Sequence, residues 1–257
     1  MKNYFISVLI SNYNKQKFLN KSLKSLILQK YKNFEIILYD DASTDNSLNV
    51  VKKFKKIQLI KNLKQKSYSG PLNQINAIYH AYKKSKGEII CLMDADDLFS
   101  LNKLRIINNF FTLNKKKNIL INLPKLPSGM FKYKKKSFFN SVWPTIFPTS
   151  CISIRRKSFR KFFSFSCLKK FPNLEIDARI IIYYFFLLNE YNVLDKILTT
   201  YTYDEKGITA KIKKFDKNWW MRRKQAFDYT KFILNKQNKK FIFNLDFFVT
   251  SIINKIF

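Results

Sequence analysis

The sequence predicts an α/β protein in which a mainly parallel sheet is flanked by helices. Short runs of branched apolar residues alternate with amphipathic segments between residues 5 and 123, which is the pattern of repeated βαβ units. Two acidic clusters directly follow two of the apolar runs, as expected where strands end at a binding site. With 257 residues, of which 46% are hydrophobic, the chain can bury the core of one such domain.

Five apolar runs are expected to be strands, because they are rich in branched residues and end at polar ones. They are residues 5–10, 34–39, 57–60, 88–93 and 119–123. Strands joined by helices of this length imply right-handed crossovers and parallel pairing. Ligands of such sheets bind beyond the carboxyl ends of the strands.

Between these runs, apolar residues recur at helical spacing. The first helix presents Leu19, Leu23 and Leu26 on one face, with Asn14 as its expected N-cap. Gly70-Pro71 opens another helix, on which the single histidine, His80, has no partner of metal-ligand type. The remaining helices are expected around residues 48–54, 101–111 and 176–187.

Acidic residues are scarce in this chain but gather at two strand ends. Asp40 and Asp41 follow the second strand, and Asp94, Asp96 and Asp97 follow the fourth. Carboxylates at adjacent strand ends repel one another unless a cation or hydrogen-bond donors compensate, and a divalent metal with oxygen ligands does so naturally. Taken singly, Asp97 would also suit an ordinary loop or capping role.

At these residues the sequence resembles a known family. FISVLISNYNKQKFLNKSLKSLILQKYKNFEIILYDDASTDNSL (5–48) and SKGEIICLMDADDLFSLNKL (85–104) are similar to the N-terminal half of family 2 glycosyltransferases, which have the GT-A fold. The resemblance implies that Ser11, Tyr13 and Asp41 contact the nucleotide base, usually uracil. It also implies that Asp94 and Asp96 form a DxD element that meets the ribose and a diphosphate bound to Mn²⁺ or Mg²⁺. Ala42 stands where the family frequently has Gly, and Leu101 where it has Pro.

The resemblance implies an inverting enzyme that moves a sugar from a nucleotide diphosphate-sugar, with UDP as the expected nucleotide, to a saccharide or a lipid-linked acceptor. We expect a GT-A-like domain over residues 1–210, with a nucleotide-sugar-binding half (1–115) and an acceptor half (116–210), and a helical extension over 211–257. Two alternatives are a sugar-phosphate nucleotidyltransferase and a non-catalytic basic module that binds nucleic acid or anionic lipid. A nucleotidyltransferase would have a Gly-rich loop after the first strand, but the segment there, SNYNKQK, contains no Gly. A non-catalytic module would leave the DADD run unexplained.

An inverting displacement needs a carboxylate that deprotonates the acceptor hydroxyl. Asp177 is the first candidate and Glu175 the second, both at the start of an apolar helix, where an acid also has an ordinary structural role. Lys66, with Lys64, is a candidate for the diphosphate or a solvated loop residue. Trp143 is a candidate sugar platform or a core residue.

The net charge and the cysteine content indicate which partners and which cellular compartment to expect. A net charge of +32 favours an anionic partner, but it comes almost wholly from Lys in a Lys-, Asn- and Ile-rich composition, so a compositional origin is equally consistent. The C-terminal KKFDKNWWMRRKQAFDYTKF suits an anionic membrane face or packing against the domain. Three cysteines without a CxxC pair, and no long apolar segment, predict a cytoplasmic protein that is soluble or peripheral at the inner face of the cell membrane.

Overall fold

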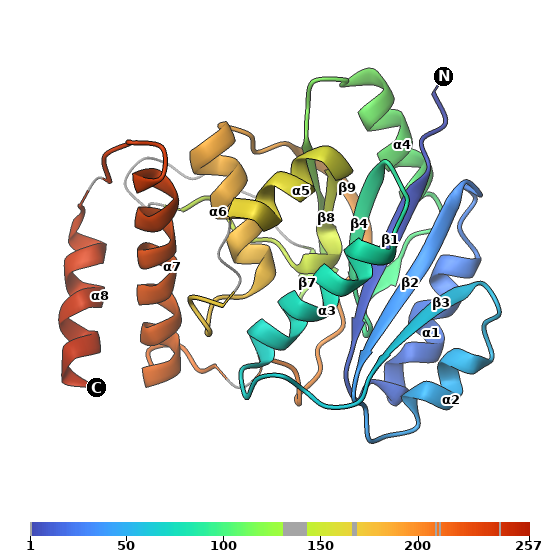
Figure 1. Ribbon diagram of the computed structural model, residues 1–257, viewed down its shortest axis with the longest axis horizontal. Coiled ribbons are helices and arrows are strands. Elements are labelled where there is room, and N and C mark those ends of the chain that lie inside the picture. Colours follow the sequence, from blue (N-terminus) through green and yellow to red (C-terminus); the bar gives the residue numbers. More distant parts are fainter. Residues whose placement is uncertain (1, 131–142, 166–168, 209, 211, 242) are drawn as a thin grey trace.

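Residues 2–130, 143–165, 169–208, 210, 212–241 and 243–257 are described by a computed structural model of the chain (Figure 1). Its strands are β1 (Ile6–Asn12), β2 (Phe34–Asp41), β3 (Ile57–Asn62), β4 (Ile89–Asp94), β5 (Leu98–Phe99), β6 (Ile119–Leu126), β7 (Gly129–Met130), β8 (Ile152–Arg155) and β9 (Val193–Thr200). Its helices are α1 (Gln16–Ile27), α2 (Ser47–Lys52), α3 (Gly70–Lys84), α4 (Lys103–Leu113), a 3-10 turn η1 (Thr149–Cys151), α5 (Arg156–Phe165), α6 (Ile176–Leu188), α7 (Lys217–Asn235) and α8 (Leu245–Ile256).

The strands form one sheet in the order β3-β2-β1-β4-β8-β6-β9-β5, with β7 paired to β6. The first four are all parallel, joined by α1, α2 and α3 as the sequence predicts. Beyond β4 the sheet becomes mixed, because β8 runs antiparallel to both β4 and β6 while β9 is parallel to β6. The α/β prediction is confirmed, and the strictly parallel part is the N-terminal half.

Helices cover both faces of the sheet (Figure 1). Along β1 the side chains alternate: Val8 and Ile10 belong to the core shared with α1, α2 and α4, and Leu9 belongs to the core shared with α3, α5 and α6. A strand buried on both faces needs the continuous apolar run that the sequence shows. Cys91 and Cys151 are buried thiols of these cores, and Cys167 lies outside the described residues.

The pairing register brings the expected strand ends together. Ser11 of β1 is opposite Tyr39 of β2 on one side and Asp94 of β4 on the other. Asp41 at the end of β2 is opposite Asn62 of β3. The acidic clusters that are far apart in the sequence therefore lie at one edge of the sheet.

One capping prediction is wrong. The residue before α1 is Lys15, and Asn14 lies in the left-handed region with φ 51°. Its Oδ1 accepts a hydrogen bond from the Thr44 backbone N–H at 2.7 Å. With this backbone conformation the Asn14 side chain reaches the loop after β2 and not the start of α1. Asn14 therefore links the loop after β1 to the loop after β2.

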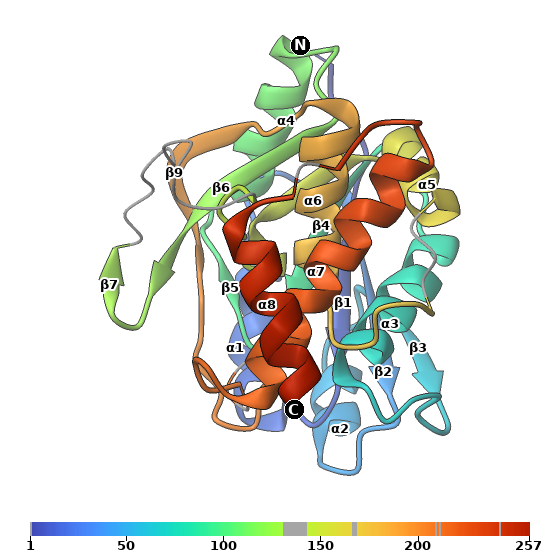
Figure 2. The same ribbon diagram turned by 90° about the vertical axis from the view of Figure 1, so that its left-hand side faces the viewer.

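The C-terminal helix α7 stands beside α6, and α8 packs on the far side of α7 (Figures 1 and 2). One face of α7 packs with α6 in a core that includes Phe227, Tyr229 and Ile182. For α7, the packing interpretation of the basic-aromatic segment is therefore confirmed. The division of the chain at residues 115 and 210 stays a prediction.

Trp143 belongs to the same core. Its ring centroid lies 4.2 Å from that of Phe227, and its Nε1 donates to Thr230 Oγ1 at 3.1 Å. Because this ring is buried against α7, the sugar-platform interpretation is wrong and the core interpretation holds. In the part of the chain that the structure describes, no helix is both long and apolar enough to cross a membrane.

Candidate active site

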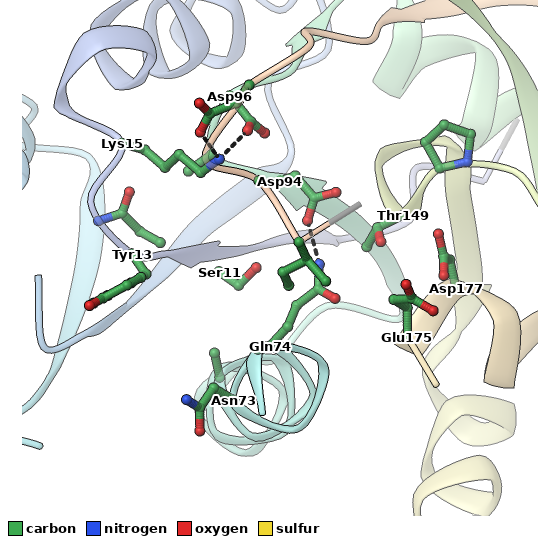
Figure 3. A pocket seen from close by; sticks show the side chains of 18 of the residues that line it. Ser11, Tyr13, Lys15, Asn73, Gln74, Asp94, Asp96, Thr149, Glu175 and Asp177 are labelled. Carbon is green, nitrogen blue, oxygen red and sulfur yellow. Dashed lines mark hydrogen bonds and ion pairs between the residues drawn. The ribbon is translucent and has the colours of Figure 1, made fainter. Parts of the chain in front are cut away.

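A cavity of about 450 Å³ opens at the carboxyl ends of β1, β2 and β4. Figure 3 shows Tyr13 and Ser11 on one side of it, Asp94 in the middle, and Glu175 and Asp177 on the other side. The walls come from α3, the start of α6, the start of α7 and the segment after β9. Side chains from both halves of the sequence meet here, including Lys15, Gln65, Asn73, Gln74, Thr149, Asp204 and Arg222.

At the β2 end, Asp41 offers a free acceptor to the cavity. Its Oδ1 accepts from Asn62 Nδ2 at 2.8 Å, whereas its buried Oδ2 has no hydrogen-bond partner among the residues that the structure describes. Burial raises the pKa of this carboxyl, and the amides of Asn62 and Gln65 partly offset that rise. An unpaired buried acceptor is costly and suits a ligand N–H. The half-exposed ring of Tyr13 lies at the same end.

Asp40 has a structural role beside it. Its Oδ2 accepts from Asn12 Nδ2 at 2.6 Å and from Ser43 Oγ at 2.7 Å. These bonds hold the turn after β2, in which Ala42 has φ 63°. This left-handed backbone explains why Gly is frequent at the position in similar sequences.

In the middle of the cavity, Asp94 and Asp96 are held by donors from α3 and from the loop before α1 (Figure 3). Gln74 Nε2 donates to Asp94 Oδ1 at 2.8 Å, and Lys15 Nζ lies 2.5 Å from Asp96 Oδ2. The same ammonium lies 2.6 Å from Asp204, in the segment after β9. Burial, followed by the charge of Asp96, raises the pKa of Asp94 to about 7.

These two carboxylates fit a divalent cation. Asp96 already attracts the Lys15 ammonium, and a second positive charge nearby would offset the burial and the charge of Asp96, which together raise the pKa of Asp94. No group of three or more acidic, His or Cys side chains able to hold a metal occurs in the described ranges. The other ligands would be oxygens of a diphosphate and water, which is how Mg²⁺ usually binds in nucleotide sites.

At the far side, Glu175 and Asp177 differ in their surroundings. Glu175 precedes α6, and its Oε2 lies 2.5 Å from Nε of Arg222 on α7. It makes no capping hydrogen bond. Asp177 has no ion pair in the described residues, and its Oδ1 accepts from the Ala178 backbone N–H at 2.7 Å. Burial, followed by the charge of Glu175, raises the pKa of Asp177 to about 7.

A fully buried arginine fixes the loop that carries these acids. Nε of Arg179 donates to the Leu174 carbonyl at 3.0 Å, and its Nη2 donates to the Lys170 carbonyl at 2.7 Å. The guanidinium thus holds the residues before α6 in place. The first turn of α6 can therefore present Asp177 at a fixed position.

The structure brings together seven of the residues that the sequence analysis names for the site. They are Ser11, Tyr13, Asp41, Asp94, Asp96, Glu175 and Asp177. Lys66 is exposed and does not line the cavity, although its charge acts on Asp41. The roles assigned to these residues stay predictions.

Three contacts escaped sequence reasoning. Lys15, Gln74 and Arg222 reach the acids from three different helical regions, and each stands in a sequence rich in similar polar residues. No local pattern distinguishes Lys15 from the other lysines around it. Only the fold shows which of them meets a carboxylate.

Comparison with known proteins places this site in a family. The model described as glycosyl transferase family 2 matches residues 7–175. The chain is 32% identical over 108 residues to the Escherichia coli UDP-Glc:alpha-D-GlcNAc-diphosphoundecaprenol beta-1,3-glucosyltransferase WfgD, which is 41% of this chain and 40% of that protein. It is 37% identical over 98 residues to the putative glycosyltransferase EpsE of Bacillus subtilis, which is 36% of this chain and 33% of that protein. The matched region thus spans less than half of either relative.

Solved structures share the fold over nearly the whole chain. Staphylococcus aureus TarS 1–349 in complex with UDP-GlcNAc has a TM-score of 0.62 at 19% identity, covering 97% of this chain and 70% of that one. The mannosyltransferase PcManGT of Pyrobaculum calidifontis, in complex with GDP-Man and Mn²⁺, has a TM-score of 0.61 at 15% identity, covering 100% and 70%. With a family match over well more than half of its residues and this GT-A-like fold, the chain belongs to glycosyl transferase family 2.

Proposed function

We propose that this protein is an inverting glycosyltransferase that moves a sugar from a UDP-sugar to a saccharide or lipid-linked acceptor with the help of Mn²⁺ or Mg²⁺. One observation carries the proposal. A single cavity holds an unpaired acceptor at Asp41, two carboxylates suited to a cation at Asp94 and Asp96, and a carboxyl of raised pKa at Asp177.

The base end supports a uracil nucleotide. Asp41 Oδ2 is a buried acceptor without a partner, and the imide N–H of uracil is the complementary donor. Tyr13 lines the same cavity with a half-exposed ring that can stack on the base. The names of two similar proteins mention a UDP-linked sugar, UDP-Glc for WfgD and UDP-GlcNAc for the TarS complex, and the name of a third mentions GDP-Man.

The middle of the cavity would receive the diphosphate. A bound divalent cation would neutralise the charge that develops on the departing diphosphate. Asp96 and Asp94 would hold this cation, and Gln74 keeps Asp94 oriented through its 2.8 Å hydrogen bond. Lys15 must leave Asp96 or share it for the cation to bind there, because its ammonium occupies that carboxylate.

The acceptor end would carry the proton transfer. Asp177 would accept the proton of the acceptor hydroxyl as its oxygen bonds to the anomeric carbon. The bond from that carbon to the diphosphate breaks on the opposite face, so the anomeric carbon is inverted. A general base works best when its pKa lies near the working pH, and a pKa of about 7 meets that condition. Glu175 is held by Arg222, so it serves to raise the pKa of Asp177 and to shape the acceptor side.

A donor-binding and transfer experiment tests the proposal. Isothermal titration with UDP, with and without Mn²⁺, should show metal-dependent binding in the wild type, and a panel of UDP-sugars should yield transfer or slow donor hydrolysis. Asp96→Asn should lose the metal-dependent part of UDP binding. Asp195→Asn, an exposed acid outside the cavity, is the matched control.

Two outcomes would contradict the proposal. UDP binding that is the same in excess chelator would remove the metal, and a product that keeps the donor's anomeric configuration by NMR would remove the single displacement. The cellular location stays part of the proposal, with the cytoplasm as the expected compartment.

A further inference from the structure

We propose that helix α8 docks the protein onto an anionic lipid membrane, with the helix lying parallel to the surface. The contact is made by the α8 stripe, which we define as Leu245, Phe248, Val249, Ile252 and Ile256. The inference concerns a surface on the far side of α7 from the sheet and does not depend on which sugar is transferred.

The stripe follows from helical spacing. At about 100° per residue, these five positions fall within an arc of about 100° on α8. The opposite side is fixed against α7, because Thr250 is fully buried and Asn254 Nδ2 donates to the Trp220 carbonyl at 3.0 Å. Figure 1 shows α8 at the edge of the molecule beyond α7, and Figure 2 shows it in front of α7. The stripe therefore points away from the protein.

The exposure of the stripe is unusual for this chain. Of the 17 large hydrophobic side chains that are exposed in the described residues, seven lie between residues 243 and 257. The exposed fractions along the stripe are 79%, 51%, 39%, 59% and 77% in chain order. A contiguous apolar surface of this kind marks a site of contact with another apolar body.

The charge around α8 favours an anionic membrane as the partner of this apolar surface. Residues 217–257 contain nine Lys and Arg but two acids, a net charge of 9 − 2 = +7. Both acids are neutralised by ion pairs, Asp228 with Lys224 at 2.6 Å and Asp246 with Arg223. Exposed lysines, including Lys255 on α8 itself, form no ion pair with another described residue and can meet the phosphates of a lipid surface.

A second copy of the chain is the weaker occupant. Pairing two stripes would bring the same excess of positive charge together in each partner, in a molecule whose net charge is +32. An anionic leaflet instead attracts the lysines and takes up the apolar side chains at once. Twelve residues of helix are about 18 Å long, which is short of the ~30 Å hydrocarbon layer, so α8 lies in the interface.

Helix α7 stands between the docking helix and the cavity. Its Arg222 pairs with Glu175, which lines the cavity, and the next residue, Arg223, pairs with Asp246 on the α7-facing side of α8. If the proposed function holds, this arrangement favours a lipid-linked acceptor, whose head group enters beside Glu175 while its lipid stays in the leaflet.

Vesicle co-sedimentation tests the docking without any donor or acceptor. The full chain should bind vesicles of phosphatidylglycerol and phosphatidylcholine, and bind much less to phosphatidylcholine alone or at high salt. Phe248→Ser/Ile252→Ser should lower the partition onto the anionic vesicles by about tenfold or more, because two inserted side chains are lost. Both positions are exposed, and an unchanged melting temperature verifies that the variant is folded.

A matched pair sharpens the result. Leu245 and Leu113 are each 79% exposed, but Leu113 lies at the end of α4, away from the stripe. Leu245→Ser should weaken vesicle binding severalfold, and Leu113→Ser should leave it unchanged. Equal binding by both variants, equal binding to neutral vesicles, or a dimer in solution that Ile252→Ser dissociates would each overturn the proposal. If the wild-type protein binds the vesicles but transfers no sugar, the proposed function is contradicted and the docking proposal is not.

Discussion

Replacing Asp177 by Asn should raise the free energy of unfolding at neutral pH and should also lower the turnover of the enzyme strongly. The pKa of this carboxyl is about 7 in the folded protein against an ordinary value of 3.8. The folded state therefore holds the proton more tightly than the unfolded state, so the free energy of unfolding falls as pH rises from about 4 to about 7. Asn cannot ionise, and its amide oxygen can still accept from the Ala178 backbone N–H.

The size of the effect follows from the shift. About three pKa units correspond to about 4 kcal/mol, and partial access of water to this side chain reduces the gain to about 2–4 kcal/mol above pH 7. The gain should shrink as the pH is lowered toward 5, where the wild-type carboxyl regains its proton. Urea denaturation of both proteins across this pH range measures it.

Activity should change in the opposite direction. Removal of a general base lowers turnover by about 10² to 10⁴, whereas the affinity for UDP should be unaffected, because Asp177 lies at the other side of the cavity from Tyr13. Wild-type turnover should rise with pH with an apparent pKa of about 7. Glu175→Gln should lower turnover less than Asp177→Asn does. Normal turnover in Asp177→Asn, or a variant that is less stable than wild type at pH 8, would refute this reasoning.

Three further predictions concern single contacts. Asp41→Asn turns a free acceptor toward uracil into a donor and should weaken UDP binding by about 1–3 kcal/mol in titration calorimetry; an affinity within twofold of wild type would contradict the contact. Lys15→Met removes the ammonium that competes with a cation for Asp96 and should lower the Mn²⁺ concentration needed for half-maximal UDP binding by about fivefold, which corresponds to about 1 kcal/mol for this largely buried ion pair. Trp143→Ala should lower the free energy of unfolding by about 3–5 kcal/mol in urea without changing UDP affinity, and a changed UDP affinity in the folded variant would contradict a purely structural role.

Much of the nucleotide half could be read from local pattern. The run from Phe5 to Ile10 indicated a strand buried on two faces, and Gly70-Pro71 marked the start of the helix α3, which carries Pro71 in its first turn. Asp41, Asp94 and Asp96 stand at strand ends, where parallel topology alone brings them to one edge. Even there, the same pattern could not separate Asp40, which holds a turn, from Asp41, which faces the cavity.

The second half depended on distant partners. Strands β8 and β9 were not predicted, because their place beside β4 and β6 depends on pairing across long stretches of chain. Trp143 looked equally suited to a sugar or to a core, and α7 decided for the core through Phe227 and Thr230.

The sequence by itself determined the α/β fold, the edge of the sheet where the acids gather, and the pair from which a base is expected, because each is written in residues close together in the chain. The tertiary structure alone decided that Lys15 meets Asp96, that Arg222 holds Glu175 and leaves Asp177 without an ion pair in the described residues, and that one side of α8 is exposed. A carboxylate's pKa and a helix's exposed face depend on what packs against them, and those neighbours come from parts of the chain that local sequence does not specify.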